Sequence, residues 1–222
     1  MLTDDAPPAR LPCPLDPLES RVLGALLEKQ QATPEYYPLT LHALVAACNQ
    51  KSNRDPVMDL SAGEVEAALE RLREHVFVWK TGGARAEKWE QNVERRWTLD
   101  GATKAVMTLL LLRGAQTLGE LRARSDRLHA FATLDEVEAA LARLAEGPEP
   151  LVAELPRRPG QKEARWTHLV GGPVEDAATP SAPAPAPSGR PDPLASRVTA
   201  LEEKMAALSR ELSDLKRKLG EG

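Results

Sequence analysis

The sequence is poor in the residues that mark several protein classes. It holds two cysteines and only 4% aromatic residues in 222 residues. Cys13 and Cys48 lie far apart without metal-ligand spacing, so we expect two reduced thiols and neither a disulfide nor a metal site. The net charge of −4 excludes a cationic surface over the whole protein. Any surface for nucleic acid must therefore be local.

Long apolar stretches are also absent. The longest, residues 105–112 interrupted by Thr108, is too short to span a bilayer, which takes about 20 residues. The N-terminus carries early acids and four prolines without an apolar segment, which is not the pattern of a signal peptide. We expect a cytoplasmic protein with no membrane partner.

No catalytic constellation is visible in the sequence. The four histidines fall in four different segments, and none has a second histidine or a cysteine at ligand spacing. Phosphate-binding glycine loops, nucleophile elbows and zinc-protease motifs are missing as well. The sequence therefore predicts a protein that is not an enzyme and needs no cofactor or metal.

What the sequence does contain is an internal repeat. Residues 64–69 and 136–141 both read Glu-Val-Glu-Ala-Ala-Leu, an offset of 136 − 64 = 72. Residues 96–98 and 165–167 both read Arg-Trp-Thr, an offset of 165 − 96 = 69. Two matches in the same order at similar offsets predict two copies of one unit.

The first copy reads as three helices and a hairpin. Asp16 and Pro17 are typical of a helix start, and apolar spacing predicts a second helix ending near Asn49. Ser61 and Glu64 form a predicted capping box for a third helix. Residues 77–79 are expected to be a strand, residues 81–83 a turn, and residues 96–99 the returning strand.

The second copy repeats this order. A helix over residues 103–113 is expected to stop at Gly114, and caps at residues 117–120 and 133–136 begin two more helices. Residues 151–155 and 165–169 are the expected strands. Three helices followed by a β-hairpin is the order of a winged helix-turn-helix.

The predicted fold class is thus mainly α with small β-hairpins (α+β): two tandem winged helix-turn-helix domains plus a C-terminal coiled-coil helix. The expected boundaries are a disordered N-terminal tail at 1–14, winged-helix domains at 15–100 and 101–170, a Pro-rich linker at 171–192 and the coiled coil at 193–219.

The C-terminal helix carries a sustained heptad. Apolar residues alternate at spacings of four and three, which favours a parallel homodimer. The predicted dimerisation residues are Leu194, Val198, Leu201, Met205, Leu208, Leu212, Leu215 and Leu219. A lone amphipathic helix lying on the domains, or pairing with another chain, remains the alternative.

Two polar stretches are candidate nucleic-acid contacts, because amides and cations suit phosphates and base edges. The first contains Asn49, Gln50, Lys51, Asn53 and Arg54, and its alternative is a loop that satisfies its own backbone. The second contains Arg122, Arg124 and Arg127 between helices, and Arg157, Arg158, Lys162 and Arg165 on the hairpin. A solvated charged surface is the alternative for the second.

Both third helices are acidic near their starts, which disfavours base reading there because the flanking phosphates would repel carboxylates. Two functional hypotheses follow. One is a DNA-associated protein, with a role in transcriptional regulation, that binds duplex DNA. The other is a protein–protein interaction adaptor that uses its winged helices as docking modules for a protein partner.

Three stretches, residues 49–58, 110–117 and 158–169, resemble the YceH-like family, bacterial proteins of uncharacterised function. The resemblance covers residues 15–172. It implies two winged-helix domains, in agreement with the internal repeat, and implies no activity, ligand or catalytic residue. The Pro-rich tail and the heptad lie outside it.

Overall fold

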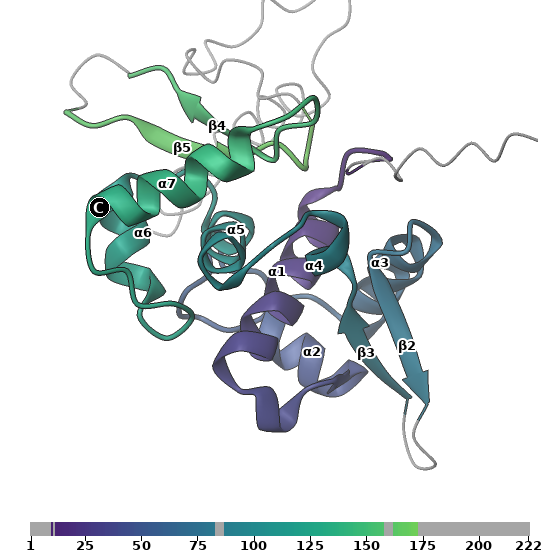
Figure 1. Ribbon diagram of the computed structural model, residues 1–222. Coiled ribbons are helices and arrows are strands. Elements are labelled where there is room, and N and C mark those ends of the chain that lie inside the picture. The colour runs from purple at the N-terminus through teal and green to yellow at the C-terminus, as the bar shows by residue number, and fades with distance from the viewer. Residues whose placement is uncertain (1–9, 11, 83–86, 158–161, 173–222) are drawn as a thin grey trace, which may run out of the picture. The chain divides into compact units, whose positions relative to one another are not determined.

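The computed structural model describes residues 10, 12–82, 87–157 and 162–172. These described residues form a mixed α/β structure with seven α-helices and two small antiparallel sheets, and they belong to one compact unit. Figure 1 shows them with α1 and α5 at the centre. The predicted coiled coil, and the predicted linker apart from Gly171 and Gly172, lie outside the described residues.

The first half of this unit contains four α-helices and a three-stranded sheet. Its elements in chain order are α1 (Pro17–Ala32), the short 3-10 helix Pro34–Tyr36, β1 (Leu39–Thr40), α2 (Leu41–Cys48), α3 (Ala62–Glu74), β2 (Val78–Gly82), β3 (Glu87–Gln91) and α4 (Val93–Arg96). The strand order is β1-β3-β2, and every pairing is antiparallel.

The second half contains three α-helices and a two-stranded sheet. Its elements are α5 (Gly101–Arg113), α6 (Leu118–Ser125), α7 (Leu134–Ala145), β4 (Val152–Leu155) and β5 (Arg165–His168). Strands β4 and β5 form an antiparallel pair.

The helix starts follow from local capping chemistry. Asp16, Ser61 and Thr117 each accept a hydrogen bond from the third helical N–H, and the glutamate there accepts one from the cap's own N–H. Such reciprocal bonds satisfy N–H groups that no helical carbonyl can reach. The predicted starts of α1, α3 and α6 are therefore confirmed. So is the predicted end of α5 at Gly114, whose φ of 68° lies in the region that glycine adopts readily.

Backbone pairing extends the repeat beyond the sequence matches. Leu39, two residues before α2, pairs with Trp89, and Gln116, two residues before α6, forms a bridge with Trp166. Both offsets equal 77 (116 − 39 and 166 − 89). The offset between α3 and α7 is 72, five less than 77. The difference arises because 13 residues (49–61) connect the second and third helices in the first half, whereas eight (126–133) connect them in the second half.

The predicted returning strand at residues 96–99 is wrong. The strand that pairs with β2 is β3, and residues 93–96 form the short helix α4. Trp97 follows α4, is 1% exposed and lies 5.9 Å from the Phe77 ring. Trp166 therefore has its structural counterpart in Trp89, and its sequence match with Trp97 has no counterpart in the fold.

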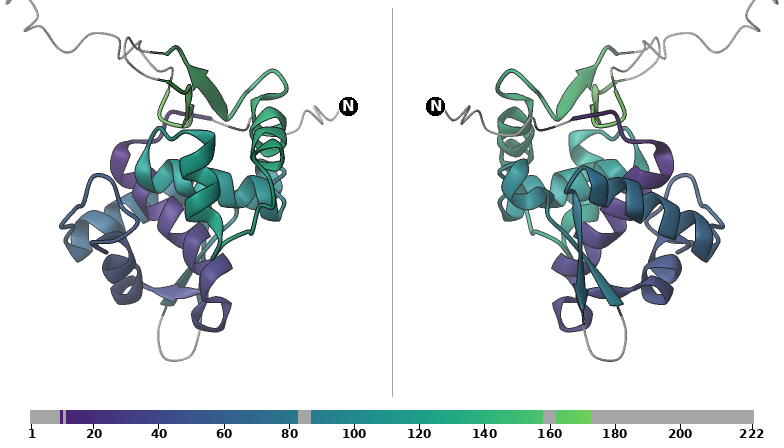
Figure 2. Two further views of the ribbon diagram at one scale, coloured as in Figure 1. Left: turned by 90° about the vertical axis from the view of Figure 1, so that its left-hand side faces the viewer. Right: turned by 90° about the vertical axis from the view of Figure 1, so that its right-hand side faces the viewer.

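Helices α1 and α5 form the centre of one continuous core. Residues 19–28 of α1 are all buried, as are residues 105–112 of α5. A helix that is buried all round lies inside a structure, and α2, α3 and α5 pack on α1 from different sides. Figures 1 and 2 show α1 and α5 side by side. The core cluster accordingly includes residues of both halves.

The contact between α1 and α5 is closest at Gly24. A Cβ atom built on Gly24 would lie 2.9 Å from Cδ2 of Leu112 and 3.0 Å from Cβ of Leu111. Side chains in packed cores do not approach so closely, so no residue larger than glycine fits here without a shift of the helices. A hydrogen bond also joins the two helices, since Gln31 of α1 donates to the Thr108 hydroxyl of α5 at 3.0 Å.

We expect Gly24→Ala to lower the free energy of unfolding by about 1–3 kcal/mol, because overpacking must separate α1 from α5. Gly63→Ala is the matched control, since nothing lies within 4 Å of a Cβ at Gly63 in α3. The control should leave stability unchanged or raise it by up to about 1 kcal/mol. Urea unfolding of both variants measures the difference, and equal effects would contradict the proposed role of Gly24.

Candidate functional site

The first predicted polar stretch lies in the loop between α2 and α3, residues 49–61. Asn49 closes this loop: its Nδ2 donates to the Leu60 carbonyl and its Oδ1 accepts from the Leu60 N–H, both at 2.8 Å. The Asn49 side chain thus satisfies backbone groups of its own loop, which was the alternative to a ligand contact.

Arg54 is placed inside the protein. Its side chain is 0% exposed, and it forms a two-pronged ion pair with Glu28 of α1, with Nη1–Oε1 and Nη2–Oε2 distances of 3.0 and 2.6 Å. Further bonds run from the guanidinium to the Ala47 carbonyl and the Gln50 side chain. Planar guanidinium groups suit such paired contacts with a carboxylate. Arg54 therefore braces the loop against α1 and has no face open to a ligand in this structure.

Two more contacts hold the loop between the halves. Arg21 of α1, which is 2% exposed, donates to the carbonyls of Cys48 and Pro56 at 3.2 and 2.6 Å. The Asp55 N–H donates to the Leu112 carbonyl at 2.9 Å. Leu112 lies in the last turn of α5, where carbonyls lack helical partners. The loop of the first half therefore caps the central helix of the second.

Lys51, Ser52 and Asn53 form the exposed tip of this loop. Asn53 adopts a φ of 58°, a left-handed conformation in which asparagine is several-fold enriched. Among the residues that the structure describes, no hydrogen bond or ion pair involves the Lys51 ammonium. The tip is therefore the part of the first stretch that can meet a ligand.

The second predicted set also contains two kinds of cation: some are bonded to backbone carbonyls or to Glu120, and others have no such partner. Arg122 donates to the Ala132 carbonyl at 2.8 Å, and Arg165 donates to the Ala115 carbonyl at 2.6 Å. Arg124 and Arg165 both contact the Glu120 carboxylate, at 3.3 and 2.9 Å. Partial burial acts to raise the pKa of Glu120, but the Thr117 N–H and these two cations outweigh it and lower the pKa. A charged Glu120 offsets part of their positive charge.

Arg127, Arg157 and Lys162 are exposed. Within the described part of the chain, none of the three has a recorded hydrogen bond or ion pair. Arg158, the remaining predicted residue, lies outside the described residues. Three predicted cations of the second half thus present their charge to solvent.

One pocket brings the two predicted stretches together. Its volume is about 710 Å³, and it lies between the loop tip and the C-terminal ends of α1 and α6. Five of its lining residues belong to the predicted set: Gln50, Lys51, Asn53, Arg124 and Arg127. We call it the inter-half pocket. Sequences far apart in the chain meet here because α1 packs on α5.

No sequence pattern indicates the rest of this pocket. Glu28 and Lys29 belong to α1, and their place beside the loop depends on how the loop folds back. Leu109, Leu112 and Leu128 also line the pocket, although their spacing marks them only as core residues. Of the three, Leu128 is partly exposed, whereas Leu109 and Leu112 are 4% and 1% exposed.

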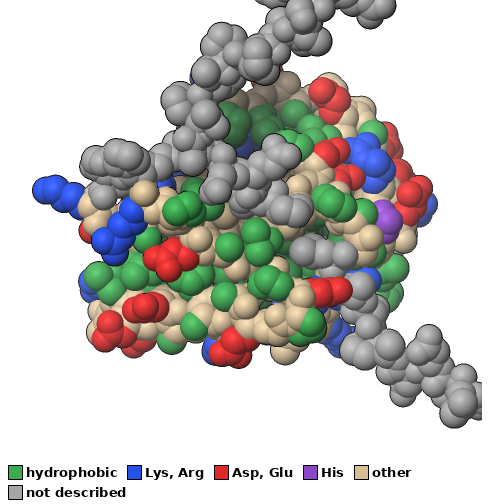
Figure 3. Space-filling view, turned by 90° about the horizontal axis from the view of Figure 1, so that it is seen from above, with side chains coloured by type: hydrophobic (Ala, Val, Ile, Leu, Met, Phe, Trp, Pro, Cys, Tyr) green, Lys and Arg blue, Asp and Glu red, His purple; other side chains and the backbone are tan. Residues whose placement is uncertain are grey.

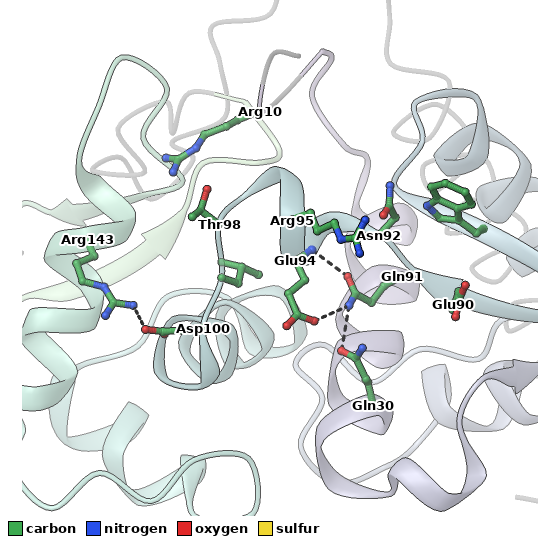
Figure 4. A pocket seen from close by; sticks show the side chains of 12 residues that line it. Arg10, Gln30, Glu90, Gln91, Asn92, Glu94, Arg95, Thr98, Asp100 and Arg143 are labelled. Atoms are coloured by element: carbon green, nitrogen blue, oxygen red, sulfur yellow. Dashed lines mark hydrogen bonds and ion pairs between the residues drawn. The ribbon is translucent and has the colours of Figure 1, made fainter. Parts of the chain in front are cut away.

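A second pocket of about 1060 Å³ lies on another part of the surface, lined by residues of α4, the β2–β3 hairpin and α7. Figure 4 shows its polar network, in which Gln91 donates to Gln30 at 3.0 Å and to Glu94 at 3.2 Å. An ion pair joins Arg143 to Asp100. Its lining holds three arginines and three acids, so it favours neither charge.

The described residues show no group of three or more metal-ligating side chains. They also contain no helix with the length and apolar character needed to cross a membrane. Both cysteines are unpaired, and burial raises the pKa of Cys48 to about 12. Such a thiol is not ionised at neutral pH and is a poor nucleophile.

We expect Arg54→Met to lower the free energy of unfolding by about 3 kcal/mol, because the Glu28 carboxylate, 12% exposed, would lose its two-pronged partner. The control Arg73→Met removes an exposed i,i+3 pair with Glu70 and should change stability by about 0.5 kcal/mol or less. Urea unfolding compares the two. Similar small changes in both variants would show that Arg54 does not hold the loop.

Comparison with known proteins places the chain in a family. The family described as "Protein of unknown function, DUF480" matches residues 15–161. The chain is 48% identical over 189 residues to a UPF0502 protein of Delftia acidovorans, with 83% of each chain covered. It is 52% identical over 159 residues to a UPF0502 protein of Geobacter sulfurreducens, covering 71% of this chain and 73% of that one. Because about half of the aligned residues are identical in these relatives, and because the family match spans both halves of the fold, this chain belongs to the DUF480 (UPF0502) family of bacterial proteins.

Proposed function

We propose that this chain is a non-enzymatic, DNA-associated protein made of two winged-helix modules in tandem. The fold supports this, because each half contains three helices followed by a hairpin, and in each half the segment before the second helix pairs with the hairpin's second strand. That order is the order of winged helix-turn-helix domains. A fold alone does not assign a function, so the proposal rests on the charges that the fold displays.

The observation that carries the proposal is the set of free cations. Lys51 from the first half and Arg127 from the second line one pocket, and Arg157 and Lys162 flank the tip of the second hairpin. All four are exposed and have no recorded partner among the described residues. Unpaired exposed cations can neutralise phosphates without first breaking an ion pair.

The helices α3 and α7 support contacts to the DNA backbone in preference to base reading. Glu64 and Glu66 of α3 are exposed, and so are Glu136 and Glu138 of α7. Carboxylates at the start of a third helix would be repelled by the phosphates that flank a groove. Acidic and basic side chains are also interspersed on the face shown in Figure 3. Phosphate contacts from the loop tip and the hairpin avoid this repulsion.

We expect salt-sensitive binding to duplex DNA of random sequence. Four phosphate contacts per chain predict a slope of about −3.6 in log K against log salt, or roughly a hundredfold loss between about 50 and 200 mM salt. The double variants Lys51→Glu/Arg127→Glu and Arg157→Glu/Lys162→Glu should each weaken binding, and Glu64→Gln/Glu66→Gln should not. Fluorescence anisotropy with labelled duplex measures all of them. Absence of binding at low salt would reject the proposal.

The second candidate function is a protein–protein interaction adaptor. The exposed acidic faces of α3 and α7 favour it, because they complement a basic protein surface better than DNA. This function would be favoured over the first if the wild-type protein does not bind DNA at low salt but binds a basic protein partner through α3 and α7.

We further propose that the C-terminal heptad, residues 193–219, makes the chain a parallel homodimer. Replacing Leu201 and Leu208 by lysine should give a monomer, since two charges would lie in the apolar seam of the coiled coil. Sedimentation equilibrium at about 10–50 µM measures the mass, and Ser209→Lys, away from the heptad seam, is the control. A wild-type chain that is monomeric at these concentrations would refute the dimer.

A further inference from the structure

The inter-half pocket has the size of a small-molecule site. Ligand pockets in proteins have volumes of about 300–1000 Å³ and combine an apolar lining with a few polar groups that orient the ligand. The pocket measures about 710 Å³, and its walls come from α1, the α2–α3 loop, α5 and α6. Both halves contribute, so the site exists only where they are packed together.

The charge of this pocket is opposite to that of the chain. Its lining holds four cations, Lys29, Lys51, Arg124 and Arg127, and one acid, Glu28, which gives 4 − 1 = +3. The whole chain carries −4. The one acid is already engaged, since Glu28 contacts Arg54 at 2.6 Å and Lys29 at 3.4 Å. Two of the cations are paired as well, Lys29 with Glu28 and Arg124 with Glu120. An anionic ligand would therefore meet two free cations, Lys51 and Arg127, and no unpaired carboxylate.

The larger pocket between α4 and α7 lacks this asymmetry. Three arginines and three acids line it, a sum of zero, and Asp100 is paired with Arg143. Of these two pockets, the inter-half pocket is therefore the one that can select an anion by charge.

The inner wall of the inter-half pocket is apolar. Its accessible part is Leu128 after α6, which is partly exposed, and Leu109 and Leu112 of α5 lie beneath the surface with exposures of 4% and 1%. The cations and the polar tip residues Ser52 and Asn53 line the remainder. A bare inorganic anion would use only the cations. A ligand that fills the pocket must join an anionic group to a compact apolar one, with hydrogen-bonding atoms that meet Ser52 and Asn53.

We propose that the inter-half pocket binds a nucleoside phosphate. Its phosphate lies against the free cations Lys51 and Arg127, and its base lies on the partly exposed Leu128. The same chemistry occurs in a free mononucleotide and in the phosphorylated end of a nucleic-acid strand. This inference goes beyond backbone binding of duplex DNA, which needs the exposed cations but no cavity.

The test uses the full-length chain and isothermal titration calorimetry at about 50 mM salt. The probes are AMP, adenosine and inorganic phosphate, together with a five-nucleotide single strand with and without a 5′-phosphate. AMP should bind in a saturable manner, at least about tenfold tighter than adenosine or phosphate, because each of these lacks one half of the contacts. Tighter binding of the phosphorylated strand than of AMP identifies the strand end as the source, and equal or weaker binding identifies the free nucleotide.

Three variants locate the site. Lys51→Glu/Arg127→Glu should weaken AMP binding at least about tenfold, whereas Arg157→Glu/Lys162→Glu, with the same change in net charge, should leave it unchanged. Ser52→Trp keeps every charge but fills the pocket from an exposed position. It should abolish AMP binding and retain salt-sensitive binding to duplex DNA. Thermal melts confirm that each variant is folded.

The outcomes separate this inference from the DNA proposal. Failure of wild-type protein to bind either AMP or the phosphorylated strand, or an equal loss in both charge variants, overturns the pocket assignment and leaves the duplex experiment untouched. Binding of AMP that survives Ser52→Trp also overturns it. If the wild-type chain binds AMP but not duplex DNA, and Ser52→Trp abolishes AMP binding, the pocket assignment holds while the DNA proposal fails.

Discussion

The close contact of α1 with α5 at Gly24 is the constraint on which the rest of the structure depends. Both helices are buried all round, so each provides the main apolar surface of its own half and of the other. A Cβ at Gly24 would lie 2.9 Å from Leu112. The two halves thereby share one core. Their relative position is fixed by packing, as it is between elements of a single domain.

This shared core explains why Arg54, a cation of the first predicted stretch, points inward. Arg54 pairs with Glu28, and Arg21 reaches the carbonyls of Cys48 and Pro56, so the loop after α2 is held down at several points. Asp55 then binds the last turn of α5. A loop tied to both central helices is a rigid wall. Lys51 at its tip is consequently held in place, which lowers the entropy lost when it meets a phosphate.

Local signals predicted the helices well, and long-range contacts explain what they missed. The caps at Asp16, Ser61 and Thr117 involve residues three positions apart, so sequence alone reveals them. Strand β3 is polar apart from Trp89, and only its pairing with β1 and β2 makes it a strand. In the site, nothing in the sequence distinguishes Arg54, which is buried against Glu28, from Lys51, which is exposed. That difference depends on α1, more than twenty residues away.

The same logic explains how an acidic chain can present a positive site. Cations near the ends of α1 and α6 complement the negative ends of those helices, and Arg124 and Arg165 share Glu120. These interactions neutralise part of the positive charge. The charge that remains comes from Lys51 and Arg127, one from each half, whose pocket exists only because α1 and α5 pack together. Because Lys51 and Arg127 come from different halves, their positions relative to each other depend on how the halves pack. A ligand bound between them would therefore also stabilise the contact at Gly24.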